Sequence, residues 1–225
     1  MARTFDPTMT PSLTLLVGNK NYSSWSMRAF LPLSVSGLPF AEEKILLYVP
    51  GSKDAILQHS PSGKVPALVV QPGNHVIWDS LAIAEYVAEL VPEKQLWPAD
   101  ALARAHARSI CAEMHSGFQA VRNALSMDIQ RRFPFPESPS EALLKDIQRI
   151  QDIWANCIAR YGGPFLFGKH FSNADAFYAP VATRFVTYNV PVSDTTKAYI
   201  DAVLAHPSVK AWTDEGVKET EVLTF

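Results

Sequence analysis

The sequence predicts two domains of different class, an α/β domain followed by an all-helical domain. Up to residue 92, short apolar runs typical of strands alternate with helical patterns. A segment bounded by Pro92 and Pro98 then interrupts the pattern, and beyond it only helical spacing remains. The chain has 225 residues, of which 48% are apolar, which is enough for two cores. We therefore expect an α/β domain at 12–92, a linker at 93–98 and a helical domain at 99–225.

The first domain is expected to run strand, helix, strand, helix, strand, strand, helix (βαβαββα), a crossover unit followed by a hairpin. Its strand patterns are residues 13–17, 40–48, 65–70 and 75–78, and its helical patterns are residues 25–36, 52–59 and 80–91. Pro32 lies inside the first helical pattern, where a proline costs about 3 kcal/mol or kinks the helix. An apolar face made by Phe30, Leu31 and Val35 remains on both sides of it. We therefore expect one helix, which ends at Gly37.

The second domain is expected to contain only helices, with a proline-rich loop at residues 133–139. The helical patterns are residues 99–131, 140–161, 173–188, 195–205 and 208–216. The second of these patterns stops at Gly162, which is followed by a further glycine and a proline that do not continue a helix. This half of the chain therefore adds no strand to the predicted fold.

The charge balance excludes two classes of partner. Lysine and arginine number 20, and aspartate and glutamate number 22, whereas a protein that binds nucleic acid or a membrane surface needs a basic excess. No run approaches the roughly 18 consecutive apolar residues of a membrane span. Residues 1–11 are polar and lack the apolar core of a signal peptide. We expect them to form a flexible tail on a cytoplasmic protein.

Cysteine and histidine usage indicates neither a disulfide nor a metal site. Cys111 and Cys157 lie far apart within helical patterns, with no zinc spacing and no disulfide framework. Cysteines buried in helices are commoner than reactive ones. The six histidines also lack ligand spacing. We therefore expect two buried thiols and no metal.

Residues 21–28 (Asn-Tyr-Ser-Ser-Trp-Ser-Met-Arg) place three serines where the first strand joins the first helix. A helix start offers unpaired N–H groups and the positive end of a dipole, and both favour an anion. A serine hydroxyl adds a hydrogen-bond donor, so this segment is suited to hold a thiolate. By its position we expect Ser23 to be the donor, with Ser24 and Ser26 as alternatives. The simpler interpretation is that Ser23 or Ser24 only caps the helix.

Val65 and Pro66 open the third strand pattern, at a position where proline cannot donate to a strand ladder. If the peptide bond between them is cis, the Val65 N–H and C=O point outward. They could then pair with a peptide that lies alongside, as one extra strand residue does. Because only about 5–6% of such bonds are cis in folded proteins, the residues alone favour trans.

Asp79 and Ser80 begin the last helical pattern of the first domain, where either can serve as a cap. A helix start with a hydroxyl also suits a carboxylate, and Asp79 suits an ammonium group. Together with Val65 and Ser23, these residues fit one ligand, a γ-glutamyl tripeptide with a central thiol. Lys64 is placed to contact its far carboxylate.

Four segments in order carry a resemblance to a known family. They are residues 23–28 (Ser-Ser-Trp-Ser-Met-Arg), 60–68 (Ser-Pro-Ser-Gly-Lys-Val-Pro-Ala-Leu), 79–83 (Asp-Ser-Leu-Ala-Ile) and 171–175 (Phe-Ser-Asn-Ala-Asp). From about Leu13 to Trp212, the chain resembles the soluble glutathione transferase superfamily, of bacterial type with a zeta-like serine motif. Trp25 stands where the zeta class usually has cysteine, and Asp79 stands where glutamate is commoner.

The resemblance implies a thioredoxin-like first domain, a cis Val65–Pro66 bond and usually a homodimer. It also implies a detoxification enzyme that activates the glutathione thiol at Ser23 for attack on an electrophilic small molecule. Glutathione would be a co-substrate, with no permanently bound cofactor. The residues implied to bind it are Ser24, Lys64, Val65, Asp79 and Ser80. Ser172 and Asp175 would form a capping box, which is a structural role, as is that of Pro66.

Two other functions remain open at this point. The zeta-like serines also favour a glutathione-dependent cis–trans isomerase such as maleylacetoacetate isomerase, although Trp25 alters the motif. The same fold could instead carry a non-catalytic glutathione-binding or scaffold protein.

The pocket for the electrophile is expected between the loop after the first strand and the long helical pattern of the second domain. Its candidate residues are Asn19, Tyr22, His115, Gln119 and Arg122. Arg28 lies one turn beyond the serines and could add positive potential there. We expect it to form a structural salt bridge instead.

Overall fold

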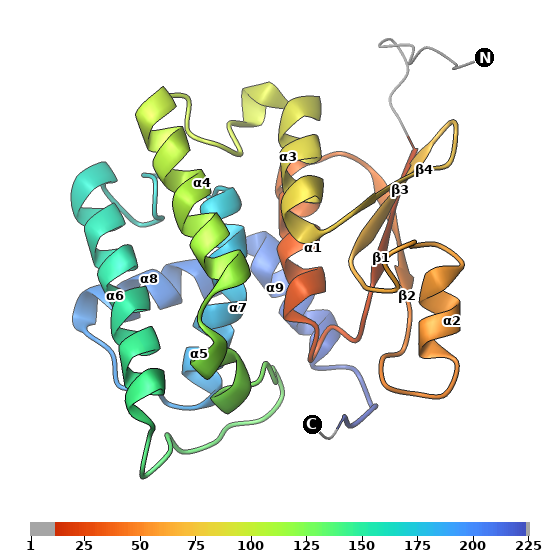
Figure 1. Cartoon of the computed structure of the whole chain (residues 1–225). Helices are drawn as coiled ribbons and strands as arrows, with labels where there is room; N and C mark the ends of the chain where they lie inside the picture. Colours follow the sequence, from red (N-terminus) through yellow and green to blue (C-terminus); the bar gives the residue numbers. More distant parts are fainter. Residues whose placement is uncertain (1–11, 224–225) are drawn as a thin grey trace.

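The computed structural model describes residues 12–223, so the predicted tail at 1–11 lies outside the described residues. Figure 1 shows a sheet with α2 (Ser52–Leu57) on one side and α1 (Ser24–Ser36) and α3 (Ser80–Leu90) on the other, and the remaining helices beyond α1 and α3. The predicted fold class is confirmed: an α/β domain of thioredoxin type (βαβαββα) precedes an all-helical domain.

The sheet has four strands in the order β2-β1-β3-β4. The strands are β1 (Ser12–Val17), β2 (Phe40–Lys44), β3 (Ala67–Gln71) and β4 (His75–Trp78). β1 pairs in parallel with β2 and antiparallel with β3, which pairs antiparallel with β4. Alternate β1 residues face opposite layers: Leu15 packs in the core toward α1 and α3, whereas Leu16 packs with Ile56 of α2.

The second strand is shorter than the pattern at 40–48 predicts, because side chains take over the hydrogen bonds after Ile45, whose N–H still donates to the Val17 carbonyl at 2.9 Å. The Leu47 N–H donates to Asn19 Oδ1 at 2.9 Å, and Ser52 Oγ donates to the Leu46 carbonyl at 2.7 Å. Helix α1 forms one helix through Pro32, as predicted, and ends at Gly37 with φ +75°. Glycine adopts this left-handed conformation without the steric cost that other residues bear.

The second domain is built around α7 (Asn173–Thr187), whose residues are nearly all buried. It packs against α1 of the first domain and against α4 (Ala101–Ser116) and α8 (Asp194–Ala205) of its own. The other helices are η1, a short 3₁₀ turn in the linker (Pro92–Lys94), α5 (Gln119–Ala124), α6 (Glu141–Tyr161) and α9 (Pro207–Gly216). The contact of α7 with α1 brings the second domain next to the serine segment.

The single helix predicted at 99–131 is wrong. Helix α4 stops at Ser116, and the backbone of Gly117 comes so near the preceding turn that a Cβ there would lie 2.8 Å from the Glu113 carbonyl oxygen. After α5 the chain is held in an irregular path, because Asn21 Oδ1 accepts from Ile129 N at 2.7 Å and from Gln130 N at 3.0 Å. These partners are more than 100 residues apart, so helical periodicity could not reveal the break.

Helix α7 starts with a capping box at Ser172 and Asp175. Asp175 is fully buried, and its carboxylate accepts from Leu166 N, Ser172 N, Ser172 Oγ and Tyr199 Oη at 2.9–3.1 Å. Burial raises the pKa of this carboxyl above its usual range, while these four donors act in the opposite direction. The group ties the start of α7 to α8 and to the preceding loop.

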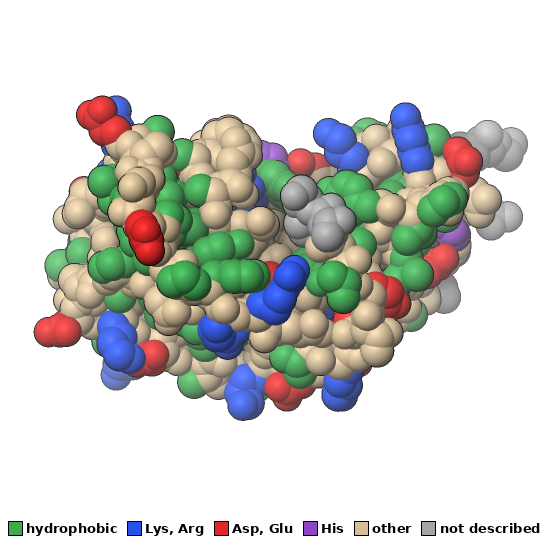
Figure 2. Space-filling model, turned by 90° about the horizontal axis from the view of Figure 1, so that it is seen from below, with side chains coloured by type: hydrophobic (Ala, Val, Ile, Leu, Met, Phe, Trp, Pro, Cys, Tyr) green, Lys and Arg blue, Asp and Glu red, His purple; other side chains and the backbone are tan. Residues whose placement is uncertain are grey.

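Figure 2 shows one face of the molecule, on which acidic and basic side chains are interspersed rather than gathered by sign. This distribution agrees with the near balance of 20 basic and 22 acidic residues. Among residues 12–223, no helix is both long enough and apolar enough to cross a bilayer.

Candidate functional site

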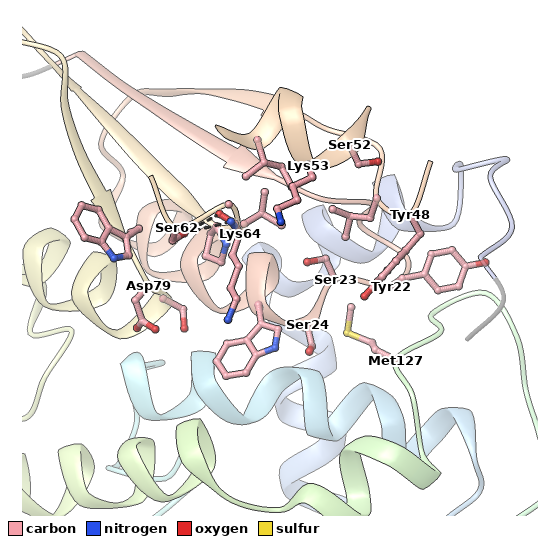
Figure 3. Close-up of a pocket in the computed structure, with 18 of the residues that line it drawn as sticks. Tyr22, Ser23, Ser24, Tyr48, Ser52, Lys53, Ser62, Lys64, Asp79 and Met127 are labelled. Atoms are coloured by element: carbon pink, nitrogen blue, oxygen red, sulfur yellow. Dashed lines mark hydrogen bonds between the residues drawn. The ribbon is translucent and has the colours of Figure 1, made fainter. Parts of the chain in front are cut away.

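A cleft of about 1300 Å³ lies between the two domains. The first domain contributes the start of α1, the loop before α2, the Val65–Pro66 segment and the start of α3. The second domain contributes residues of α4, α5 and α7 and of the segment after α5. Figure 3 shows Lys53 and Lys64 reaching into this space, with Ser23, Ser24 and Met127 on its far side.

Ser23 is the N-cap of α1 and lines the cleft. Its Oγ accepts from Ser26 N at 3.3 Å and donates to Ser26 Oγ at 2.8 Å. Ser26 is fully buried and its Oγ accepts from Gly18 N at 3.0 Å, so it supports Ser23 from inside and does not line the cleft. Because hydroxyl hydrogens rotate, Ser23 can turn its hydrogen from Ser26 Oγ to a ligand and still accept from Ser26 N.

Ser24 also lines the cleft, but it is directed differently. Its Oγ accepts from Arg184 Nη2 at 3.1 Å, which links α1 to α7. In Figure 3 the Ser24 hydroxyl points toward the ribbons of the helical domain, whereas the Ser23 hydroxyl points toward Lys53 and Lys64. Of the three serines, Ser23 therefore faces the part of the cleft built by the first domain.

The loop that carries these serines is held by contacts with Glu219, Trp212 and the segment at Ile129. Glu219 accepts from Lys20 N at 2.8 Å and from Asn21 N at 3.0 Å, and Trp212 Nε1 donates to the Lys20 carbonyl at 3.0 Å. Asn21 in turn holds the segment at Ile129, as described above. The sequence reasoning missed Asn21 and Glu219, and no local signal could have identified Glu219, since it lies 198 residues from Asn21.

The Val65–Pro66 bond is cis, the conformation that the family resemblance implies. No hydrogen bond to the Val65 main chain is formed within the part of the chain that the structure describes. Val65, Pro66 and Lys64 all line the cleft. The valine N–H and C=O are therefore available to a peptide in the cleft.

Asp79 and Ser80 lie at the other end of the side of the cleft that the first domain forms. Asp79 is the N-cap of α3, with φ +77°, and its Oδ1 accepts from Leu81 N at 2.8 Å. Its Oδ2 lies 3.2 Å from His115 Nε2 of α4, which joins the two domains across the cleft. Ser80 is 1% exposed, and its Oγ has no partner within residues 12–223. A buried hydroxyl without a partner at a helix start is suited to receive a ligand carboxylate.

Within the residues that the structure describes, Arg28 does not form the salt bridge expected from the sequence. It is 1% exposed, and neither its Nε nor its Nη1 has a hydrogen-bond partner in the described chain. Its guanidinium instead lies over the rings of Trp25 and Phe177, at 4.5 and 5.6 Å from their centroids. Burial, together with the charges of Arg122 and Arg184, holds the pKa of Arg28 well below its usual range.

Three of the five residues expected around the electrophile line the cleft, namely Tyr22, His115 and Arg122. Asn19 is buried and binds the Leu47 N–H, and Gln119 donates to Asn123 instead. Trp25, which the sequence reasoning treated only as a departure from the motif, lies between the serines and the helical domain. The ring of His115 meets the Trp25 ring edge-on at 5.1 Å.

Both cysteines are buried, and burial raises the pKa of each thiol, for Cys157 to about 12. Neither lines the cleft. Residues 12–223 contain no group of three or more side chains suited to hold a metal ion. The polar groups that line the cleft are therefore serine and tyrosine hydroxyls, backbone groups, arginines, lysines, the Asn123 amide, the Asp54 carboxylate and the Asp79–His115 pair.

Two family models match the chain. The model described as Glutathione S-transferase, N-terminal domain, matches residues 22–90. The model described as Glutathione S-transferase, C-terminal domain, matches residues 99–215.

Individual relatives agree with these matches. A probable maleylacetoacetate isomerase of Caenorhabditis elegans is 36% identical over 45% of this chain and 46% of its own length. The chain thus spans about half of that relative. Glutathione S-transferase Z1 of Arabidopsis thaliana is 28% identical over 80% of this chain and 85% of its own length. Among solved structures, a glutathione transferase homolog from Burkholderia with bound glutathione matches with a TM-score of 0.67 and 27% identity, covering 91% of this chain and 97% of that one.

Proposed function

This chain belongs to the glutathione S-transferase family, and on that premise we propose that it is a serine-type transferase that activates the glutathione thiol at Ser23. The single observation that carries the proposal is the position of the Ser23 hydroxyl. It lies at the start of α1 in a cleft that also presents the unpartnered Val65 main chain and the unpartnered Ser80 hydroxyl. The solved relative from Burkholderia contains glutathione.

Glutathione binding would use the first-domain wall from end to end. The γ-glutamyl carboxylate would accept from Ser80 at the start of α3, and its ammonium would approach Asp79. A carboxylate has about four lone-pair sites, so Asp79 can accept this ammonium while it keeps Leu81 N and His115. The cysteinyl peptide would pair with Val65, and Lys64 would contact the glycyl carboxylate. Ser24 completes the binding residues next to the sulfur.

Activation would follow from the position of the sulfur at the amino end of α1. A free cysteine-type thiol has a pKa of about 8.5, so little thiolate exists at neutral pH. A hydroxyl donor and the helix end both stabilise the anion. One unit of pKa depression corresponds to about 1.4 kcal/mol, which is within the range of one hydrogen bond to a charged group. The thiolate would then attack an electrophilic carbon.

Three alanine variants test the assignment. Ser23→Ala should lower kcat for glutathione conjugation to an aryl halide about tenfold or more, because one hydrogen bond to the anion is lost. The glutathione Kd should change far less. Ser109→Ala, on the exposed face of α4, is the matched control. If Ser23→Ala keeps full turnover while Ser24→Ala loses it, Ser24 takes the role; unchanged turnover in Ser23→Ala, Ser24→Ala and Ser26→Ala together would refute a serine mechanism.

A second candidate function is a glutathione-dependent cis–trans isomerase. It is favoured by the relative from C. elegans that carries the name of a maleylacetoacetate isomerase. In that reaction the thiolate adds to a double bond, the adduct rotates, and the thiolate leaves again. An assay of maleylacetoacetate with glutathione decides this question, and a rate no higher than background removes the isomerase.

A non-catalytic glutathione-binding or scaffold protein is the third candidate, because fold does not determine function. Titration calorimetry with glutathione separates it from the two enzymes. Binding without turnover of any electrophile would favour a binding protein, and no binding at millimolar glutathione would favour a scaffold.

Four further properties are predictions for this chain. We expect a homodimer, which light scattering on the purified protein checks. We expect glutathione to act as a co-substrate with no permanently bound cofactor, which mass spectrometry under native conditions checks. We expect a cytoplasmic location and a role in detoxification, which cell fractionation and electrophile sensitivity of a deletion strain check. The division at residues 93–98 can be tested by limited proteolysis.

A further inference from the structure

The two walls of the cleft differ in charge. The carboxylates that line it, Asp54 and Asp79, both come from the first domain, and so do Lys53 and Lys64. The residues that the second domain contributes carry no carboxylate; they are His115, Arg122, Asn123, Ser126, Met127 and Arg184. The second wall is therefore cationic, although the protein as a whole carries a formal net charge of −2.

Arg122 of this wall and the buried Arg28 of α1, which does not line the cleft, both lie over the ring of Trp25. The guanidinium carbon of Arg122 lies 4.9 Å from the ring centroid, and that of Arg28 lies 4.5 Å from it. Arg184 joins them through its bond to Ser24, the residue before Trp25. Burial and the charge of Arg122 lower the pKa of Arg184 to about 10. The guanidinium charges of Arg28, Arg122 and Arg184 therefore lie close enough to repel one another.

No acidic side chain in the described chain pairs with Arg28 or Arg184. Arg122 feels the charge of Asp146, but that carboxylate is taken up by Ala120 N and Val121 N and does not line the cleft. Buried charges without a counter-charge are costly. An anion in the cleft would supply the missing counter-charge.

Arg122 is the member of this group best placed to contact such an anion. Its Nε donates to the Gly117 carbonyl at 2.9 Å and its Nη2 donates to the Met114 carbonyl, which anchors the side chain at the end of α4. No hydrogen bond of its Nη1 is formed within residues 12–223, and the residue is only partly buried at the cleft. A guanidinium held in this way presents its remaining N–H donors in a defined direction, as carboxylate recognition requires.

We propose that the second-domain wall binds a carboxylate of the electrophilic second substrate, with Arg122 as its contact and the charges of Arg184 and Arg28 behind it. The inference rests on the proposed function, since the electrophile must lie beside a glutathione sulfur at Ser23. It assigns the substrate class, an organic anion, and applies equally to conjugation and to isomerisation.

The inference can be tested by measuring the binding of two glutathione conjugates, which requires no catalysed reaction. S-(para-carboxybenzyl)glutathione and S-(para-carbamoylbenzyl)glutathione have the same shape and differ in one charge. The carboxylate should bind about tenfold more tightly, the equivalent of one hydrogen bond to a charged group, and the preference should shrink as ionic strength rises. Arg122→Gln should abolish the preference, Arg122→Lys should retain part of it, and Arg28→Met should reduce it less than Arg122→Gln.

The control is Arg160→Gln, which removes a guanidinium that lies over another aromatic ring, 5.4 Å from the centroid of Tyr161, outside the cleft. It should leave the preference intact. Equal binding of the two conjugates by the unaltered protein, while glutathione itself binds, would overturn this inference and leave the proposed function standing. If Arg122→Gln weakens glutathione as much as the carboxylate conjugate, the charge serves glutathione and the inference is also overturned. Failure of all three ligands to bind would refute the proposed function itself.

Turnover gives an independent readout. A para-chloro-dinitrobenzoate and its amide both react by attack of the thiolate on the carbon that bears chlorine: a C–S bond forms and chloride leaves. Each kcat/KM is divided by the rate of the same compound with free glutathione, so that intrinsic reactivity cancels. The corrected ratio should favour the benzoate about tenfold, as for the conjugates, and should fall toward one in Arg122→Gln.

Discussion

Asp175 and Arg28 are both fully buried charged groups, yet their surroundings are opposite. Asp175 accepts four hydrogen bonds, at 2.9–3.1 Å, and holds the start of α7. Arg28 has two nitrogens without a partner in the described chain, and its guanidinium lies over the rings of Trp25 and Phe177. A buried charged group that has all its hydrogen-bond partners stabilises the fold. One whose partners are missing, beside a cleft, is a candidate for binding.

The largest loss of stability is expected on removing Asp175, the buried charge that has a complete set of hydrogen-bond partners. Asp175→Ala should lower the free energy of unfolding by about 3 kcal/mol, because it leaves several buried donors without an acceptor. Urea denaturation measures this change. The matched control is Asp201→Ala, an exposed carboxylate 2.8 Å from Lys197 on α8, which should cost about 0.5 kcal/mol or less. If the two variants were equally stable, Asp175 would not be the folding device described here.

An intermediate effect is expected at Glu219, whose side chain is 5% exposed and whose two oxygens accept from Lys20 N and Asn21 N. Glu219→Gln should cost about 1.5 kcal/mol, since one oxygen is replaced by an NH₂ group that faces an N–H donor. Because this carboxylate holds the Ser23 loop, kcat for conjugation should fall as well. Lys44 Nζ lies 3.3 Å from Glu219 Oε1 and 3.9 Å from Glu221 Oε1, so Glu221→Gln is the control for loss of a charge beside Lys44. Loss of stability with an unchanged kcat would separate the loop contact from catalysis.

The smallest change in the free energy of unfolding is expected at Arg28, and this change should be an increase. Arg28→Met replaces an unpaired buried cation with a flexible apolar chain and should raise the free energy of unfolding by up to about 1 kcal/mol, after loss of the contacts with Trp25 and Phe177 is subtracted. Thermal and urea unfolding measure the change. A loss as large as that of Asp175→Ala would mean that Arg28 is structural, and the contrast between the two charges would fail.

Local features of the chain were predictable where neighbouring residues decide them. The stop at Gly37, the start of α6 at Ser140 and the capping box at Ser172 each depend on groups within a few residues. The βαβαββα order followed from apolar periodicity for the same reason.

The site was predictable in part. The motif placed Ser23 and Ser80, since both are helix-start residues. It did not show that Ser26 turns inward to Gly18, because that contact depends on how α1 meets β1. It also gave no sign of Glu219, whose bonds to the serine loop span most of the chain.

The sequence by itself determined the two-domain order, the caps and the family motifs of this protein, because each rests on a short run of residues. Tertiary structure alone decided that the helix after residue 99 breaks at Gly117, where the backbone crowds the Glu113 carbonyl. It also decided that no acid pairs with Arg28 within residues 12–223, and that Arg28 and Arg122 meet at the Trp25 ring while Arg184 bonds to the neighbouring Ser24. The charge around a side chain is set by segments brought together from α1, α5 and α7, and no local pattern records which segments those are.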